Sequence, residues 1–121
     1  MPRVLIVDDS PTEIYRFKTI LERNGYEVLS AEAGAEGVSK ARTEQADLVL
    51  MDVIMPGLNG FQATRQLVSN EETAHIPVVI VTTKDQETDK LWGKQQGACD
   101  YLTKPVEETL LLDVVRRVLQ Q

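Results

Sequence analysis

The sequence predicts an α/β fold with a doubly wound parallel sheet, and two observations support this prediction. Strand-like and helix-like segments alternate along all 121 residues, a pattern typical of βαβ units. Three of the strand-like segments are unbroken aliphatic runs, VLIV at 4–7, LVLM at 48–51 and VVIV at 78–81. Such runs are expected where helices cover both faces of a sheet. The length suits one domain with one core.

Two further segments have the composition of edge strands in the same sheet. Residues 26–30 (YEVLS) and 99–103 (CDYLT) mix polar with apolar side chains, which suits strands at the margins of a sheet. Five strands with the second and the fifth at the edges match the order 2-1-3-4-5 of the flavodoxin-like (βα)5 fold. We therefore predict that fold for a single domain spanning residues 1–121.

Five helices are predicted to follow the strands. The first begins with an N-cap serine, an N1 proline and a capping-box glutamate (Ser10, Pro11 and Glu13) and ends near Gly25. Three shorter or more polar helices come next, around 38–41, 61–67 and 86–96. The last helix is the most clearly amphipathic. Its predicted apolar stripe consists of Leu110, Leu111, Val114, Val118 and Leu119.

The composition argues against nucleic-acid and membrane partners. The formal net charge of −6, without a cluster of basic residues, repels nucleic acid. No apolar stretch approaches the ~18 residues of a membrane span. The single cysteine, Cys99, allows no intramolecular disulfide, which suits a reducing, cytoplasmic compartment. We expect Cys99 to be packed and inert, and the single histidine, His75, to be an ordinary loop residue.

Acidic, hydroxyl and basic side chains follow four of the predicted strands. Asp8 and Asp9 follow the first strand and Asp52 the third, while Thr82 ends the fourth and Lys104 follows the fifth. Each signal is weak alone, since acids are common at helix starts and in turns. Together they are informative, because the carboxyl ends of parallel strands share one edge, where ligands bind. The pattern predicts a site there.

The residue types at this edge suit phosphoryl chemistry with a metal ion. Three neighbouring carboxylates repel one another, and a hard dication such as Mg²⁺ relieves that repulsion. A carboxylate is also a competent nucleophile toward phosphorus and forms an acyl phosphate. The ammonium of Lys104 and the hydroxyl of Thr82 are suited to neutralise the oxygens of the transferred group.

Four segments and their spacing resemble the CheY-like receiver domains of two-component response regulators, over essentially the whole chain. They are LIVDDS, LVLMDVIMPGLNG, PVVIVTT and GACDYLTKP. The resemblance implies that Asp52 accepts a phosphoryl group from a sensor histidine kinase, for which we expect the chemotaxis type. It also implies a Mg²⁺ site made by Asp8, Asp9, Asp52 and the main-chain carbonyl of Ile54, in which Asp9 binds the ion directly and Asp8 acts through the water shell of the ion.

The same resemblance assigns the remaining site residues. Lys104 and Thr82 contact the phosphoryl group, Thr82 and Tyr101 form the switch, and the peptide before Pro105 is cis. With no output domain expected, the switch acts by binding a partner or as a phosphate sink, as a monomer or weak dimer. DSPTE, MPGLNGFQATRQL, IPVVIVTTKDQETDK and DYLTKPV further resemble single-domain regulators of type IV pilus twitching motility.

Two positions near the site, Ile54 and Trp92, leave alternatives open, and a third, Lys84, departs from the chemotaxis member. Ile54, two residues after the acceptor, is apolar where the chemotaxis member has an amide, so it either slows hydrolysis of the acyl phosphate or only packs at the rim. Lys84, two residues after Thr82, is basic where that member has an acid. Trp92 either packs at the core margin or lies exposed between Lys90 and Lys94 as an anchor for a partner.

Two other classes of function fit the sequence less well. A phosphatase of the haloacid dehalogenase type also uses an aspartate nucleophile with Mg²⁺, but it needs Asp-x-Asp where this chain has Asp52-Val53-Ile54. A flavodoxin-like electron carrier needs a loop rich in hydroxyl groups and glycine after the first strand. Here that loop reads DDSPTE, whose charge repels a flavin phosphate. A phosphorylation-controlled binding switch is the favoured prediction.

Overall fold

Strands and helices alternate strictly in the structure, a computed structural model that describes residues 1–120. Gln121, the last residue of the predicted domain, lies outside the described residues. The elements are β1 (Arg3–Val7), α1 (Pro11–Arg23), β2 (Glu27–Ala31), α2 (Gly34–Thr43), β3 (Leu48–Met51), α3 (Gly60–Ser69), β4 (Val78–Thr82), α4 (Glu87–Gln95), β5 (Asp100–Thr103) and α5 (Glu108–Leu119). All five predicted strands and all five predicted helices are present.

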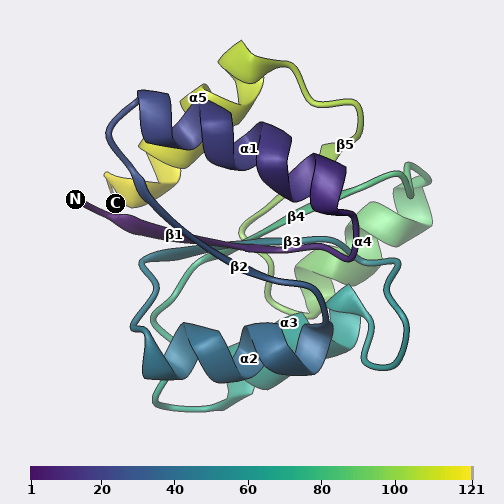
Figure 1. Ribbon diagram of the computed structural model, residues 1–121. Helices are drawn as coiled ribbons and strands as arrows, with labels where there is room; N and C mark the ends of the chain where they lie inside the picture. The colour runs from purple at the N-terminus through teal and green to yellow at the C-terminus, as the bar shows by residue number, and fades with distance from the viewer. Residues whose placement is uncertain (121) are drawn as a thin grey trace.

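The five strands form one parallel sheet in the order β2-β1-β3-β4-β5. The predicted flavodoxin-like order is therefore confirmed, with β2 and β5 at the edges. Helices α1 and α5 cover one face of the sheet, and α2, α3 and α4 cover the other (Figure 1). Because β1 and β3 are neighbours at the centre, their carboxyl ends open between the two helical layers.

The aliphatic runs are continuous because both faces of each central strand are buried. In β1, Val4 and Ile6 pack with α1 and α5, while Leu5 and Val7 pack with α2 and α3. This alternation follows from the two-residue period of a strand. The three central strands thus lie between two cores, which fix the positions of their carboxyl ends.

The start of α1 differs in one detail from the predicted capping box. Ser10 is the N-cap, and its hydroxyl accepts the N–H of Glu13 at 3.3 Å. The Glu13 carboxylate does not accept the Ser10 N–H in return, because that N–H donates to Asp8 Oδ1 at 2.9 Å. The predicted stop is confirmed, since Gly25 has a positive φ of 88° just after the C-cap. The helix start is therefore tied to an acid of the predicted site.

The predicted apolar stripe of α5 is partly wrong. Leu110 is 48% exposed and Leu119 is only partly buried, whereas Leu112 and Val115 are buried with the rest of the face. The reason is geometric, because α5 packs against both the sheet and α1 and so buries a wide arc. Leu110 is rotated about 100° from the buried Leu111, at the limit of that arc.

Three expectations drawn from composition can be compared with the structure. Cys99 is exposed where the chain enters β5, so the prediction that it is packed is wrong. Partial burial of its thiol and the charge of Asp100 still raise the pKa of Cys99, which disfavours the reactive thiolate. His75 lies exposed in a turn, as predicted. Within residues 1–120, none of the helices has the length and apolar character needed to cross a membrane.

Gly60 lets the start of α3 approach the chain just after β3. A Cβ built on Gly60 would lie 1.9 Å from the carbonyl oxygen of Asp52, a clash with main chain that a side-chain rotation cannot relieve. The Gly60 N–H also donates to the Val53 carbonyl at 3.0 Å. At its other side, the Asn59–Gln62 capping box fixes the first turn of the helix. The segment carrying Asp52 is thereby held against α3.

Candidate functional site

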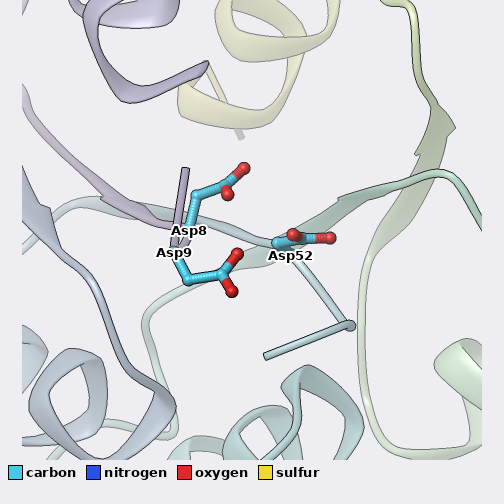
Figure 2. A group of neighbouring side chains, drawn as sticks. All are labelled: Asp8, Asp9 and Asp52. Atoms are coloured by element: carbon cyan, nitrogen blue, oxygen red, sulfur yellow. The ribbon is translucent and has the colours of Figure 1, made fainter. Parts of the chain in front are cut away.

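Three carboxylates meet at the carboxyl edge of the sheet, as the strand-end pattern predicts. Asp8 and Asp9 follow β1, Asp52 follows β3, and one oxygen of each lies within 4.8 Å of those of the other two. Figure 2 shows the three side chains next to one another. The Asp52 N–H donates to the Val7 carbonyl at 2.9 Å, which continues the pairing of β1 with β3. The predicted convergence of these strand ends is confirmed.

Lys104, directly after β5, brings a positive charge into the same cluster. Its Nζ donates to Asp8 Oδ2 at 2.8 Å and lies 3.6 Å from Asp52 Oδ2. The Lys104 side chain is only 13% exposed. Its backbone N–H donates to the Thr82 carbonyl at 2.8 Å, and the Lys104–Pro105 peptide is cis, as expected. One partly buried ammonium therefore bridges the two buried carboxylates.

The three acids have different environments. Asp8 and Asp52 are 2% and 7% exposed, whereas Asp9 is exposed. Asp8 Oδ1 accepts the Ser10 N–H, and Asp52 Oδ1 accepts the Val53 N–H at 2.8 Å. In each buried carboxylate, one oxygen is thus bound to main chain and the other lies on the side of Lys104. Solvent reaches the cluster past Asp9.

Burial and neighbouring charge make the ionised form of Asp52 costly. Burial raises the pKa of Asp52, and the charge of Asp8 raises it further. The charge of Lys104, the Val53 N–H and the Thr82 hydroxyl act in the opposite direction, but the net pKa remains raised. For Lys104, burial alone lowers the pKa. The hydrogen bond to Asp8 and the carboxylate charges outweigh burial, and the pKa of Lys104 is raised.

The donor set at this edge fits a hard divalent cation. Mg²⁺ binds oxygen ligands at about 2.0–2.1 Å, so ligand oxygens on opposite sides of the ion lie about 4 Å apart. The oxygens of Asp8, Asp9 and Asp52 fall within 4.8 Å of one another, which small side-chain movements bring into that range. Mg²⁺ also retains waters, and the exposed Asp9 leaves a side of the cluster open to them.

Thr82 and Tyr101, the predicted switch residues, contact the same loop. Thr82 is fully buried at the end of β4, and its hydroxyl accepts the Lys84 N–H at 3.4 Å. Tyr101, on β5, is partly buried, and its hydroxyl donates to the Lys84 carbonyl at 2.7 Å. Burial and the charges of nearby carboxylates raise the pKa of Tyr101 to about 12, so the hydroxyl remains a donor. Both residues therefore hold the loop that leads into α4.

Trp92 is 52% exposed, so it lies on the surface rather than at the core margin. It lines a hollow of about 480 Å³ beside the acidic cluster, together with Ile54, Phe61 and Lys84. Ile54 is itself 55% exposed, which argues against simple packing at the rim. Lys90 and Lys94 lie about 160° around α4 from Trp92, so the three predicted partner residues occupy two flanks of the helix.

Sequence reasoning missed two residues that support the site. Gly60 is one of them, although its Asn-Gly context after the acceptor is a signal for a close approach to main chain. Asp89 was not singled out. It binds both the Lys84 ammonium, at 3.5 Å, and the Gln86 N–H, at 3.3 Å. Gln86 and Asp89 form a capping box in the structure, but Gln-x-x-Asp departs from the usual Ser/Thr-x-x-Glu/Gln pattern, so the sequence did not indicate it.

The fold and the acidic edge define the class of protein, and comparison with known proteins agrees. Residues 4–116 match the response regulator receiver domain. The chain belongs to the family of response regulator receiver domains of two-component systems. Members of this family accept phosphate from histidine kinases and act as signalling switches, not as turnover enzymes in the usual sense.

Individual relatives refine this assignment. The chain is 65% identical to protein PilH of Pseudomonas aeruginosa over 119 residues, covering 98% of each sequence. The structure of the chemotaxis protein CheY4 of Vibrio cholerae is 33% identical, with a TM-score of 0.92 and 98% coverage of both chains. The receiver domain of the sensor histidine kinase PA1611 of P. aeruginosa, solved with a magnesium ion coordinated in its active site cleft, is 28% identical with a TM-score of 0.91, covering 99% of this chain and 98% of that one.

Several other curated relatives are longer proteins. The chain spans between 13% and 52% of their length. The same domain thus occurs both as nearly an entire protein, as in PilH, and as one part of larger regulators and sensor kinases. What those larger proteins do as wholes does not transfer with the domain.

Replacing Asp52 by asparagine is expected to raise the free energy of unfolding at neutral pH without divalent cations. The folded chain binds a proton at Asp52 more tightly than the unfolded chain, because the folded-state pKa is raised. Stability is therefore lost as pH rises from the ordinary value of 3.8 through that raised pKa. Asparagine has no such loss, so the advantage of the variant shrinks as pH falls.

Urea unfolding of wild type and Asp52→Asn, at neutral pH and near the ordinary carboxyl pKa, measures this difference. Asp113→Asn is the matched control, since Asp113 is exposed on α5. It removes the same charge from the chain and is expected to change stability by less than about 0.5 kcal/mol. An Asp52→Asn variant that is less stable than wild type at neutral pH would contradict the electrostatic account.

Proposed function

We propose that this chain is a phosphorylation-controlled switch that accepts a phosphoryl group on Asp52. One observation carries the proposal: a single ammonium, Lys104 Nζ, lies 2.8 Å from Asp8 Oδ2 and 3.6 Å from Asp52 Oδ2 inside a cluster of three carboxylates. A cation shared by two acids is free to turn toward a phosphoryl group on one of them. The family of the chain supports the same function.

The reaction follows from the position of each group. An oxygen of Asp52 attacks phosphorus, a P–O bond forms, and the P–N bond to the donor histidine breaks as its imidazole leaves. Lys104 faces the new phosphoryl oxygens from the side of β5. Asp8, Asp9, Asp52 and the Ile54 carbonyl would hold Mg²⁺, which would supply the remaining neutralisation of charge when bound. The magnesium ion coordinated in the active site cleft of the related PA1611 receiver domain supports a magnesium site here.

Thr82 is the residue best placed to report the phosphoryl group to the surface. Its hydroxyl is fully buried, lies beside Asp52 and accepts the main-chain N–H of Lys84. A phosphoryl group attracts that hydroxyl and so favours one position of the loop after β4. Tyr101, which binds the same loop, moves with it. The signal is the difference between the contacts that phosphate makes in the two arrangements.

The biological setting is proposed from the relatives. The identity to PilH supports a role in type IV pilus twitching motility, and that to the chemotaxis protein CheY4 supports a donor kinase of the chemotaxis type. The switch acts in the cytoplasm, as a monomer or weak dimer, by binding a partner protein or by draining phosphoryl groups. Lys90 and Lys94 on one flank of α4 and Trp92 on the other are the candidate contacts.

Phosphorylation of the purified protein tests the assignment of the acceptor. Wild type incubated with acetyl phosphate and Mg²⁺ is expected to gain the mass of one phosphoryl group, and Asp52→Asn is expected to gain none. Asp47→Asn, an exposed aspartate at the opposite edge of the sheet, is the matched control and should behave as wild type. A phosphoryl group that persists on Asp52→Asn, at mass-spectrometric resolution of the intact chain, would refute the assignment.

Ile54 is expected to slow the loss of the phosphoryl group. Its exposed side chain lies at the mouth of the site and has no polar group to orient an attacking water. Ile54→Asn supplies an amide there, and we expect the phosphorylated variant to hydrolyse about three- to tenfold faster, equivalent to about 0.7–1.4 kcal/mol of barrier. Phosphate release measured after removal of the donor gives the rate.

The control for this rate is Leu110→Asn, which makes the same kind of change at an exposed leucine on α5. It is expected to leave hydrolysis unchanged. An Ile54→Asn variant that hydrolyses at the wild-type rate or more slowly would show that Ile54 does not limit access of water.

A further inference from the structure

Lys84 is the one residue of the β4–α4 loop that contacts three different elements through three different groups. Its N–H donates to the Thr82 hydroxyl at the end of β4, at 3.4 Å. Its carbonyl accepts the Tyr101 hydroxyl from β5, at 2.7 Å. Its ammonium lies 3.5 Å from Asp89 Oδ1 in the first turn of α4. A movement of Thr82 therefore acts on a residue that is also bound to α4.

Asp89 is the α4 end of this connection. Its Oδ2 accepts the Gln86 N–H at 3.3 Å, while Oδ1 faces the Lys84 ammonium. The two oxygens thus tie the last loop residue and the loop lysine to the same helical turn. The Asp89 side chain is 18% exposed and that of Lys84 is 38% exposed, so the ion pair is partly shielded from water. Such a pair is stronger than a freely exposed one.

Trp92 lies one turn beyond Asp89 on α4. It lines the same hollow as Lys84, Asp89 and Ile54, next to the acceptor site. A change in the first turn of α4 therefore alters the surroundings of the only tryptophan in the chain. A displacement that starts at Thr82 and reaches Lys84 and Asp89 would change the shape of the surface around this hollow.

We propose that the Lys84–Asp89 ion pair couples the phosphorylation site to α4. Lys84 is a positioning residue in this proposal: it holds the loop in the arrangement where the Thr82 hydroxyl faces Asp52, and it passes the movement of Thr82 to α4 through Asp89. The inference rests on the proposed function and adds the route by which that function reaches the surface. It requires both members of the pair, because neither charge alone connects the loop with the helix.

A different role for Lys84 makes opposite predictions. If its ammonium served to contact the phosphoryl group directly, Asp89 would compete for it. Removing the charge of Asp89 would then free Lys84 and strengthen the binding of phosphate. In the coupling proposal, removing either charge weakens the same arrangement, and removing both is no worse than removing one.

The test uses beryllofluoride, a phosphoryl mimic, with Mg²⁺ and the purified protein. Affinity is measured by ¹⁹F NMR of the bound mimic, and the response of α4 by Trp92 fluorescence. Lys84→Met keeps the aliphatic stem without the ammonium, and Asp89→Asn keeps an oxygen for the Gln86 N–H without the charge. We expect each to weaken binding by about two- to fivefold, the size of a partly exposed ion pair. We also expect the fluorescence change at saturation to be lost.

Three further variants sharpen the result. The double variant Lys84→Met/Asp89→Asn is expected to match the single variants rather than multiply their effects. Lys84→Arg keeps the charge and is expected to restore most of the fluorescence change. Glu87→Gln is the matched control, since Glu87 is a highly exposed acid in the same first turn and forms an ion pair with Lys90 rather than with Lys84. It is expected to respond as wild type.

The outcomes separate the two levels of the proposal. Tighter binding by Asp89→Asn, multiplicative effects in the double variant, or an intact fluorescence response in Lys84→Met would each overturn the coupling while leaving the proposed function in place. A wild-type protein that binds no beryllofluoride would overturn the proposed function, and the coupling with it. Circular dichroism melting of each variant shows that the fold is retained.

Discussion

The structure depends on electrostatic repulsion that the fold concentrates and only partly relieves. Asp8 and Asp52 are buried beside each other, with Asp9 adjoining, because the parallel pairing of β1 with β3 leaves their carboxyl ends no other place. Lys104, which follows β5, places its ammonium between Asp8 and Asp52 and offsets part of this repulsion. Burial, together with the repulsion that Lys104 does not offset, raises the pKa of Asp52. A divalent cation bound by the three carboxylates would relieve the repulsion that Lys104 leaves.

The rest of the fold keeps that cluster from relaxing. The central strands are buried on both faces, so their ends cannot separate without exposing two cores. Gly60 lets α3 press against the main chain of Asp52, and Asp8 is tied to the start of α1 through Ser10. On the remaining side, contacts of Lys84 and Asp89 join the loop after β4 to Thr82, Tyr101 and α4.

Most of the fold, and the convergence of the site, follow from the sequence for physical reasons. Aliphatic runs that end in acids leave little freedom once the strands pair in parallel, which is why Asp8, Asp9, Asp52 and Lys104 could be placed together. Burial along α5 was harder to predict, because the width of a buried arc depends on its neighbours. The exposure of Cys99 and Trp92 and the clamp formed by Asp89 depend on tertiary contacts with no local pattern.

The central claim is that a single dication relieves the repulsion of the three carboxylates. The most direct measurement is the free energy of unfolding of the wild-type protein as Mg²⁺ is added at neutral pH. The account predicts a logarithmic rise, reaching about 1.4 kcal/mol when Mg²⁺ is in tenfold excess over its dissociation constant, and little or no rise in Asp9→Asn and Asp52→Asn. A wild-type stability that does not change with Mg²⁺, or rises equally in those variants, would contradict it.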